Sequence, residues 1–379
     1  MASALAMWWS GREQSCSNRL LRRLSSVLAA LGVRSTPAAP PRRLRLAVVG
    51  DCHGQYNEDD NAALLALVPD AALFVGDYDN EAADIPRTIA KLHGALPVAS
   101  IMGNHDAWYL SKLIARERMA LDSASSSASS LAPGAQPRLG ESAEFESVRQ
   151  QHSLLAPSNV GWGRRDFEAL PLSVVGGRPL SSGGASLERH ARMYSSLWGV
   201  RGAEESAAVI AKHVRAAPPG AATVMLAHNG PSGLGSARDD ICGKDWGGGG
   251  GGDWGDEDLR LALSDVTGVP VVIFGHMHDR LQGGGQRSMV CRGADGRLYV
   301  NGARVPRWRT APSGCGVERL FTMVDLEQSS GGWAAARVEQ VWALPDGRVT
   351  EREPLWSVDD EVEQIRQSRS QDKREQNVA

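Results

Sequence analysis

The sequence contains few cysteines, and they show no pattern. Five occur in 379 residues, without a pair at the CxxC spacing and without a regular interval between them. This scarcity argues against a disulfide framework and against a structural zinc site built on cysteine. We therefore expect the protein to work in a reducing compartment.

Long apolar runs and a strong net charge are missing as well. No run approaches the roughly 20 apolar residues that a membrane-spanning helix needs, so the sequence predicts no transmembrane segment. A net charge of −3 excludes a strong basic field over the whole protein, and nothing at this level points to nucleic acid as a partner. The length of 379 residues is sufficient to bury a core without cross-links.

Residues 1–43 have the composition of a targeting peptide. They contain seven arginines and many serines and alanines, against a single acidic residue, Glu13. This composition predicts import into an organelle, and the Met-Ala start favours the chloroplast over the mitochondrion. The structural alternative is an amphipathic helix over Asn18–Leu31 that docks on the rest of the protein.

From Leu44 onward, short β-branched apolar runs alternate with segments of helical periodicity. The helical candidates, Asp84–Leu96 and Ala203–Ala216, have apolar residues at intervals of three and four. Three later runs have no helices between them and are typical of antiparallel strands of a second sheet: Leu298–Val300, Leu320–Val324 and Ala335–Trp342. We predict an α/β fold with two sheets over residues 44–357.

Low-complexity segments interrupt this domain near residues 121–140 and 247–252. The first is rich in Ser, Ala, Pro and Gly, and the second is a hexaglycine, so we interpret both as loop expansions. The acidic-aromatic pairs Asp245-Trp246 and Asp253-Trp254 flank the hexaglycine and predict either a substrate lid or an unstructured insertion. Residues 358–379 are charged and are predicted to form a solvated tail.

Five apolar runs each end in a cluster of side chains that can bind metals. The runs are Leu44–Gly50, Ala71–Val75, Pro97–Met102, Ala222–Ala227 and Pro270–Phe274, and the clusters are Gly50-Asp51-Cys52-His53, Gly76-Asp77, Gly103-Asn104-His105-Asp106, His228-Asn229 and Gly275-His276-Met277-His278. Ligands bind beyond the carboxyl ends of the strands in open α/β sheets. The five strand ends therefore predict one shared site.

The spacing within the clusters supports this interpretation. Side chains alternate along an extended chain, so Asp51 and His53 face one side while Cys52 faces the other. The same alternation applies around Met277, and we expect both Cys52 and Met277 to pack in the core. A glycine stands directly before four candidate ligands, at positions where the backbone must turn sharply or a phosphate must approach closely. These ligands are Asp51, Asp77, Asn104 and His276.

The side chains that we predict to bind metal combine carboxylate, imidazole and amide oxygen: Asp51, His53, Asp77, Asn104, His228, His276 and His278. Such a set suits Mn, Fe or Zn. Seven ligands suffice for two ions that share one carboxylate. Two ions can clamp phosphoryl oxygens and lower the pKa of a bound water from about 15.7 to around 7. We therefore predict a hydrolase of phosphoric ester bonds that attacks a small phosphorylated substrate with a metal-bridging hydroxide.

These motifs, in this order, resemble those of the calcineurin-like metallophosphoesterase superfamily: DxH, GD, GNH(D/E), H and GHxH. The resemblance implies a four-layer α/β/β/α sandwich of two mixed β-sheets flanked by helices. It also implies that Asp77 bridges the ions, one held by Asp51, His53 and His278 and the other by Asn104, His228 and His276. His105 would contact the phosphate or protonate the leaving group, and Asp106 would orient His105.

The sequence departs from the family pattern after Asp77. The family commonly has GDxxD, but here Asn80 stands where the last aspartate is usual. We expect altered hydrogen bonding around an intact set of metal ligands. The stretch Gly50–Gln55 resembles the Ser/Thr protein phosphatase branch, yet the arginines of that branch are replaced by Tyr78-Asp79-Asn80 and Ile101-Met102. A protein phosphatase is therefore an alternative, not the main prediction.

Other interpretations stay open. Taken singly, Asp77 and Asn104 are also typical of turns, and His228 of a buried core histidine. The chain could also be an inactive scaffold with the phosphoesterase fold, or a nuclease. A nuclease would need a basic groove, for which the candidates are Arg164, Arg165, Arg304, Arg307 and Arg309. Asp256 is predicted to begin the helix before the GHMH strand as its N-cap.

Overall fold

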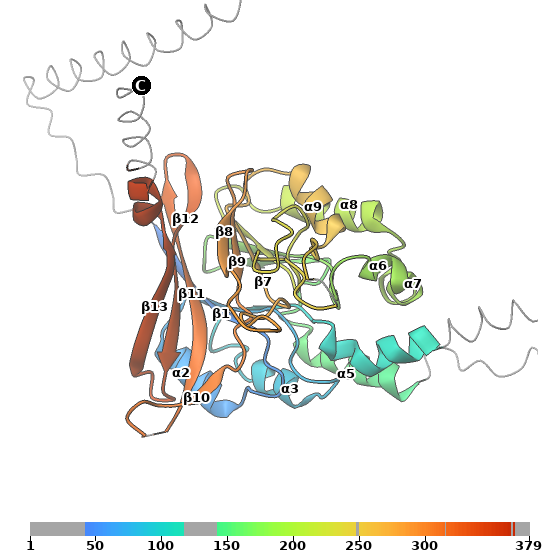
Figure 1. Ribbon diagram of the computed structural model, residues 1–379, viewed down its shortest axis with the longest axis horizontal. Helices are drawn as coiled ribbons and strands as arrows, with labels where there is room; N and C mark the ends of the chain where they lie inside the picture. The colour runs from blue at the N-terminus through green and yellow to red at the C-terminus, as the bar shows by residue number, and fades with distance from the viewer. Residues whose placement is uncertain (1–41, 117–141, 248–249, 315, 365–366, 368–379) are drawn as a thin grey trace, which may run out of the picture. The chain divides into compact units, whose positions relative to one another are not determined.

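The computed structural model of the protein describes residues 42–116, 142–247, 250–314, 316–364 and 367 (Figure 1). The predicted targeting peptide up to residue 41, the low-complexity segment 121–140 and the tail from residue 368 lie outside the described residues. Residues 358–364, at the start of the predicted tail, are helical. Among the described residues, no helix combines the length and the apolar character needed to cross a bilayer.

The first sheet, sheet A, has seven strands in the order β13-β12-β11-β1-β2-β3, with β10 paired to β11. Its parallel part consists of β1 (Arg43–Val49), β2 (Ala71–Phe74) and β3 (Val98–Ser100). Its antiparallel part consists of β10 (Trp308–Thr310), β11 (Val317–Ser329), β12 (Gly332–Ala343) and β13 (Val349–Ser357). Strand β11 pairs antiparallel with β1 and joins the two parts.

The second sheet, sheet B, has six strands in the order β4-β5-β6-β7-β9-β8. They are β4 (Arg164–Phe167), β5 (Leu172–Gly176), β6 (Ala222–Leu226), β7 (Val271–Phe274), β8 (Val290–Arg292) and β9 (Leu298–Asn301). The four inner strands are parallel, and the two outer strands, β4 and β8, are antiparallel to their neighbours. Both sheets are therefore mixed.

We predicted that the three late runs form antiparallel strands of one second sheet, and this prediction is wrong. The run at Leu298–Val300 lies in sheet B beside β7, with which it is parallel. The runs at Leu320–Val324 and Ala335–Trp342 pair with β1 and with each other in sheet A. The five runs that end in polar clusters are divided as well, three in sheet A and two in sheet B.

The core lies in two apolar layers, which the alternation along β1 shows. Leu46 and Val48 belong to the cluster between the sheets, together with Val224 of β6. Ala47 and Val49 belong to the cluster that includes residues of the helices. Each face of β1 is thus buried, and a shift by one residue would exchange the two sets of side chains. This fixes the register of the strand from which Asp51 emerges.

Helices lie against the outer faces of both sheets, which confirms the predicted four-layer α/β/β/α sandwich. One group lies at the bottom of Figure 1 against sheet A and contains α2 (Glu58–Ala66), α3 (Asp84–Ala90) and α5 (Ala143–Leu155). The other lies against sheet B and contains α6 (Ser186–Arg189), α7 (Ala191–Trp198), α8 (Ala203–Arg215) and α9 (Glu257–Ser264). The short 3₁₀ helix η1 (His105–Ala107) follows β3.

The two predicted helices are present, but one is shorter than expected. Helix α8 agrees with the predicted range, and it begins with acidic Glu204 and Glu205 and ends with basic side chains, an order that suits the helix dipole. Helix α3 ends at Ala90 instead of reaching Leu96. Gly94 adopts a left-handed φ of 93°, so the turns before β3 cannot continue the helix.

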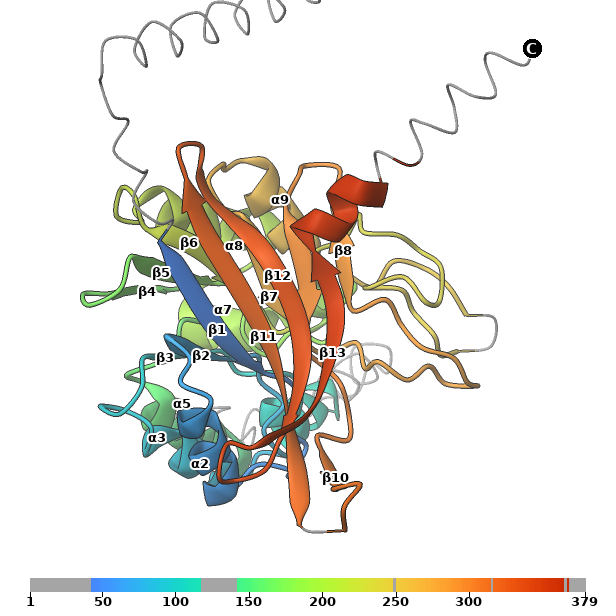
Figure 2. The same ribbon diagram turned by 90° about the vertical axis from the view of Figure 1, so that its left-hand side faces the viewer.

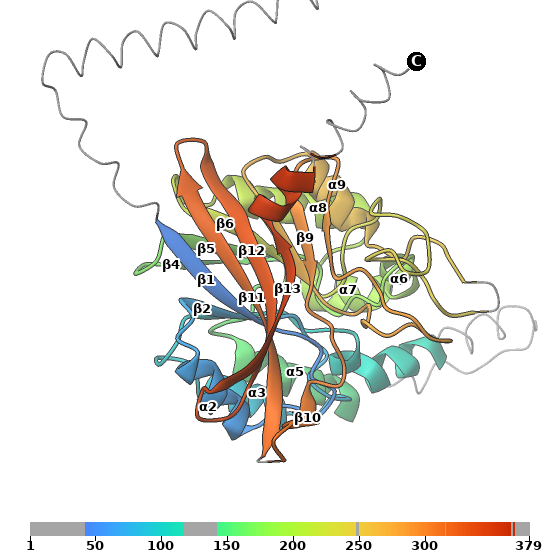
Figure 3. The ribbon, with the colours of Figure 1, turned by 60° about the vertical axis from the view of Figure 1, so that its left-hand side comes forward.

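The flanks of the hexaglycine form a hairpin. Gly243 bridges Asp253, Lys244 N donates to the carbonyl of Gly252 at 2.9 Å, and Trp254 N donates to the carbonyl of Cys242 at 2.9 Å. An unstructured insertion is therefore wrong for these flanks, and residues 248–249 lie outside the described residues. Figures 2 and 3 show this hairpin and the loop after β7 leaving the sheets on the same side.

Candidate metal centre

The predicted metal ligands converge beyond the carboxyl ends of β1, β2, β3, β6 and β7. Ligand atoms lie within 4.8 Å of one another in three groups, which are Asp51, His53 and His278; Asp77, His228 and His276; and His53, Asp77 and His105. Side chains separated by more than 200 positions in the sequence thus meet in one place. We call the seven predicted ligands together the metal centre.

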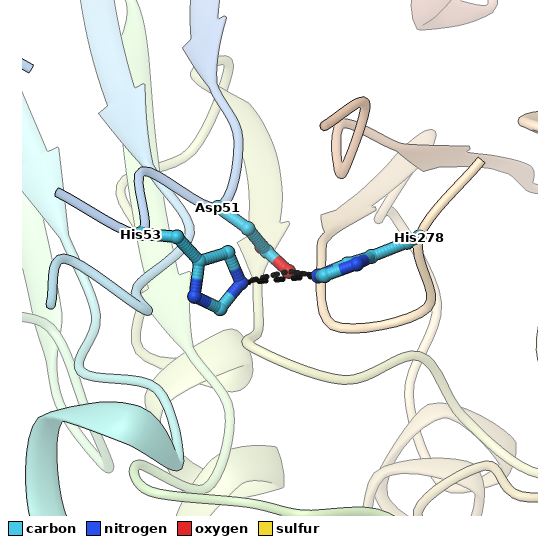
Figure 4. A group of neighbouring side chains, drawn as sticks. All are labelled: Asp51, His53 and His278. Carbon is cyan, nitrogen blue, oxygen red and sulfur yellow. Dashed lines mark hydrogen bonds and ion pairs between the residues drawn. The ribbon is translucent and has the colours of Figure 1, made fainter. Parts of the chain in front are cut away.

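The outer half of the centre consists of Asp51, His53 and His278, which point toward one another (Figure 4). The Nε2 atoms of the two histidines are 3.0 Å apart, and Asp51 Oδ2 lies 3.3 Å from His278 Nε2 and 4.0 Å from His53 Nε2. Asp51 is buried, while the side chains of His53 and His278 are 23% and 41% exposed. This half is therefore the side of the centre that solvent reaches.

Burial by itself raises the pKa of Asp51, but its surroundings reverse this effect. A hydrogen bond from His278, and the charges that the neighbouring histidines carry when they are protonated, hold the pKa of Asp51 below its ordinary value. The carboxylate is therefore ionised at neutral pH, which is the form that binds metal.

The inner half contains Asp77, Asn104, His228 and His276 and is more deeply buried. His228 Nδ1 donates to the carbonyl of Val75 at 2.7 Å, and burial lowers the pKa of His228, so its imidazole is neutral. Its Nε2 then has only a lone pair. This atom nevertheless faces two oxygens that also carry lone pairs, Asn104 Oδ1 at 2.9 Å and Asp77 Oδ1 at 3.3 Å.

Acceptors that face one another without a proton between them repel unless a cation lies among them. Asp77 shows the same shortage of positive charge, because burial and then the charges of Asp51 and Asp106 raise its pKa well above the ordinary value. Asp77 Oδ2 also lies 3.8 Å from His53 Nε2, so the carboxylate reaches both halves. The residues present therefore fit two bound metal ions.

Three ligands have backbone conformations that non-glycine residues rarely adopt. The φ angles of His53, Asp77 and His276 are 43°, 52° and 69°, and each such residue costs roughly 1–3 kcal/mol. The surrounding bonds hold them in place. His53 N donates to the carbonyl of Asp77 at 2.9 Å, and His276 N donates to Asp51 Oδ2 at 3.0 Å. These left-handed backbone conformations thus direct the three side chains toward one site.

Two glycines provide the space for this approach. A Cβ on Gly103 would lie 2.3 Å from Asp77 Oδ1 and 2.5 Å from His228 Cε1, and a Cβ on Gly275 would lie 2.3 Å from Asp51 Oδ1. No larger residue fits at either position without displacing a ligand. Cys52 and Met277 are buried, as the alternation predicted.

His105 lies beside the centre and is held on two sides. Its Nδ1 is 2.8 Å from Asn80 Oδ1, and its ring stacks on Trp108 with the centroids 4.5 Å apart and the planes at 10°. Its backbone N–H donates to Asp77 Oδ1 at 2.8 Å. Burial is the main reason that the pKa of His105 is lowered to about 4, so the ring is neutral near pH 7.

The expected role of Asp106 in orienting the ring of His105 is wrong. The Asp106 carboxylate accepts from the backbone N–H groups of Gly103, Tyr78 and Asp77 at 2.7, 2.8 and 3.0 Å. It ties the loop after β2 to the loop after β3. The partner of the His105 ring is Asn80, and the position of Asn80 in the family motif was the sequence signal for this contact.

Comparison with known proteins identifies one family. The family model described as calcineurin-like phosphoesterase matches residues 44–280. The chain is 13% identical to the calcineurin-like phosphoesterase YfkN from Bacillus subtilis, with 83% of this chain and 94% of that chain covered and a TM-score of 0.40. It is 13% identical to a metallophosphoesterase from Sphaerobacter thermophilus, with 78% and 88% covered and a TM-score of 0.28. No curated protein matches the chain.

Proposed function

The chain belongs to the calcineurin-like phosphoesterase family, and from this premise we propose that it hydrolyses phosphate mono- or diesters with water activated by two metal ions. The observation that supports this proposal is the set of lone pairs that meet at His228, Asn104 and Asp77. A scaffold that had lost catalysis would not need such an arrangement.

The residues divide into two sets of ligands. One ion would be held by Asp51, His53 and His278. The other ion would be held by Asn104, His228 and His276, and Asp77 would be shared by the two ions. When bound, Mn, Fe or Zn ions would supply Lewis acidity toward phosphoryl oxygens and acidify water. The protein then needs no serine or cysteine nucleophile.

His105 would assist at the leaving group. Asn80 offers both a donor and an acceptor to the Nδ1 of His105, whereas the aspartate that is common in the family offers only acceptors. A neutral His105 can therefore carry its proton on Nε2 when the amide nitrogen of Asn80 turns to Nδ1. This proton would bond to a phosphoryl oxygen or to the oxygen of the departing alcohol. Trp108 fixes the plane of the ring through the stack.

A direct test uses purified protein loaded with Mn and a generic aryl phosphate, as a monoester and as a diester. We expect hydrolysis of at least one ester and its loss in His228→Ala. Lys212→Ala, on the exposed side of α8, is the matched control and keeps the rate. An undiminished rate in His228→Ala would contradict the proposed mechanism.

The structure gives the nuclease alternative little support. Four of its candidate arginines lie within ion-pair distance of a carboxylate: Arg164, Arg304, Arg307 and Arg309. The side chain of Arg307 is also buried. These four cations are paired with carboxylates and are therefore not free to form a basic groove.

We also propose that residues 1–43 direct the protein to the chloroplast. Their arginine-rich, serine-rich and nearly acid-free composition supports this. A fusion of residues 1–43 to a fluorescent protein should accumulate in plastids. Diffuse cytosolic fluorescence, or accumulation in mitochondria, would contradict the assignment.

A further inference from the structure

The hairpin beside the metal centre is fixed on its first arm to the loop of one ligand. Asp245 Oδ1 lies 3.2 Å from Arg287 Nη2, and Arg287 Nε donates to the carbonyl of His278 at 3.0 Å. The side chain of Arg287 is 1% exposed, so water does not screen this link. A second nitrogen of Arg287 donates to the carbonyl of Gly243. The first arm therefore keeps its place relative to His278.

The second arm is fixed to the loop of another ligand through Trp254. The carbonyl of Trp254 accepts from Asn229 Nδ2 at 2.9 Å and from Gly184 N at 2.9 Å. Its indole Nε1 donates to the carbonyl of Ser182 at 2.8 Å. Asn229 directly follows His228 in the sequence. The hairpin thus spans the loops of His228 and His278, which come from different strands of sheet B.

Two cations lie over the ring of Trp254. Lys244 Nζ is 4.8 Å from the ring centroid, and Arg189 Cζ is 5.9 Å from it. Among the described residues, no carboxylate lies within ion-pair distance of Lys244 or Arg189. The acids of the hairpin are engaged elsewhere, since Asp245 pairs with Arg287 and Asp253 accepts from the backbone N–H groups of Gly233 and Gly255.

Lys244 and Arg189 lie over the ring of Trp254, on a hairpin that is bonded to the loops of two candidate metal ligands, and cations in such a position attract anions. We propose that Lys244 and Arg189 form a subsite for a second anionic group of the substrate. This rests on the proposed function, because the scissile phosphate would occupy the metal centre. The implied substrates are phosphate esters that carry another phosphate or a carboxylate several bonds away.

Alkanediol bisphosphates and the corresponding monophosphates of increasing chain length test the subsite on the metal-loaded protein. We expect the KM of the bisphosphate to be about tenfold lower than that of the monophosphate at one best length, as a charged contact retained in the transition state would give. Lys244→Ala should bring this ratio close to one, and Lys244→Arg should restore most of it. Lys212→Ala, an exposed lysine on α8, should leave the ratio unchanged.

Calorimetric titration with alkane bisphosphonates and monophosphonates gives the same comparison without turnover. Equal affinity for the two at every chain length, or a preference that persists in Lys244→Ala, would overturn the proposal. A preserved bisphosphonate preference in a protein that hydrolyses no ester would support the subsite and contradict only the proposed function. The two failures are therefore distinguishable.

Discussion

The metal centre and the cluster around Arg178 are both buried and polar, and they are linked through Asn229, yet their bonding differs. Arg178 pairs with Asp256 at 2.6 Å and with Asp258 at 3.2 Å. Ser181 and Ser206 donate to the same two carboxylates. We call these five residues the Arg178 cluster. Each of its carboxylates accepts from Arg178 and from a serine hydroxyl. In the metal centre, by contrast, the Nε2 of His228 faces two oxygens that are also acceptors.

This difference separates a structural charge cluster from a ligand site. Burial of ionisable groups is common to both, so burial alone does not mark a site. A raised carboxyl pKa is also common to both, because burial raises the pKa of Asp77 and that of Asp256. What marks the metal centre is that the Nε2 of His228 faces the oxygens of Asn104 and Asp77. Asn229 lies at the junction, where it donates to Asp256 at 3.3 Å and directly follows His228.

The largest expected effect concerns the metal centre. Asp77→Asn removes the charge of the ligand that reaches both halves, so kcat/KM for an aryl phosphate should fall by about a thousandfold or more. The same change relieves the repulsion of Asp77 from Asp51 and Asp106. The metal-free variant should therefore unfold at the same urea concentration as the metal-free wild type, or at a higher one. If metal-free Asp77→Asn is clearly less stable than the metal-free wild type, the two regions do not differ as described.

In the Arg178 cluster, the removal of one charge should lower the stability of the protein. Arg178→Met leaves two buried carboxylates without their cation, so the free energy of unfolding should fall by roughly 3–5 kcal/mol in urea titrations, with or without metal. Arg260→Met is the matched control, because Arg260 forms an exposed ion pair with Glu257 on α9. Its removal should cost less than about 1 kcal/mol. Equal losses in both variants would argue against a structural role for the buried cluster.

Metal binding should stabilise proteins that have an intact metal centre more than it stabilises Asp77→Asn. Ions that bind only the folded chain at a hundred times their Kd stabilise it by about 2.7 kcal/mol. Chelation should lower the thermal midpoint of the wild type and of Arg260→Met, and it should have little effect on Asp77→Asn. Thermal scans with and without a chelator provide the check. Equal shifts in all three proteins would mean that the metal binds elsewhere.

The smallest expected effect concerns Trp108, which stacks on the ring of His105. Trp108→Leu removes the stacked ring, so kcat should fall roughly three- to tenfold with little change in KM, because a misoriented group loses only part of its contribution. Trp108→Phe keeps an aromatic face and should recover most of the rate. Steady-state kinetics with the aryl phosphate measure both. A loss in KM alone would indicate that Trp108 contacts substrate and does not position His105.

The sequence predicted that the candidate ligands would lie together, because each follows the carboxyl end of a short apolar strand. The need for glycine at 103 and 275 follows from the close approach of the ligands. The extended alternation assumed for Asp51-Cys52-His53 does not hold, because His53 has a left-handed φ of 43°. Sheet membership was not predictable in the same way. Strand β11 pairs with β1, with Leu46 opposite Val324, and no local pattern indicates a pairing over such a distance in the sequence.

The contacts behind the ligands were also hidden from sequence reasoning. Asp106 is adjacent to His105 in the chain, but a 3₁₀ turn directs its carboxylate to the backbone of the neighbouring loops. The position of Arg287 behind His278, and of Trp254 beside Asn229, depends on long-range packing. A polar residue in a loop has no periodicity that would indicate its partner.

The most direct test of the central claim is the number of metal ions per chain, measured by elemental analysis after the metal-loaded protein is freed of unbound ions. The ligand arrangement predicts two ions per chain in the wild type and fewer in Asp77→Asn and His228→Ala. A folded wild-type chain that retains no Mn, Fe or Zn, or that retains as much as the two variants, would contradict the account.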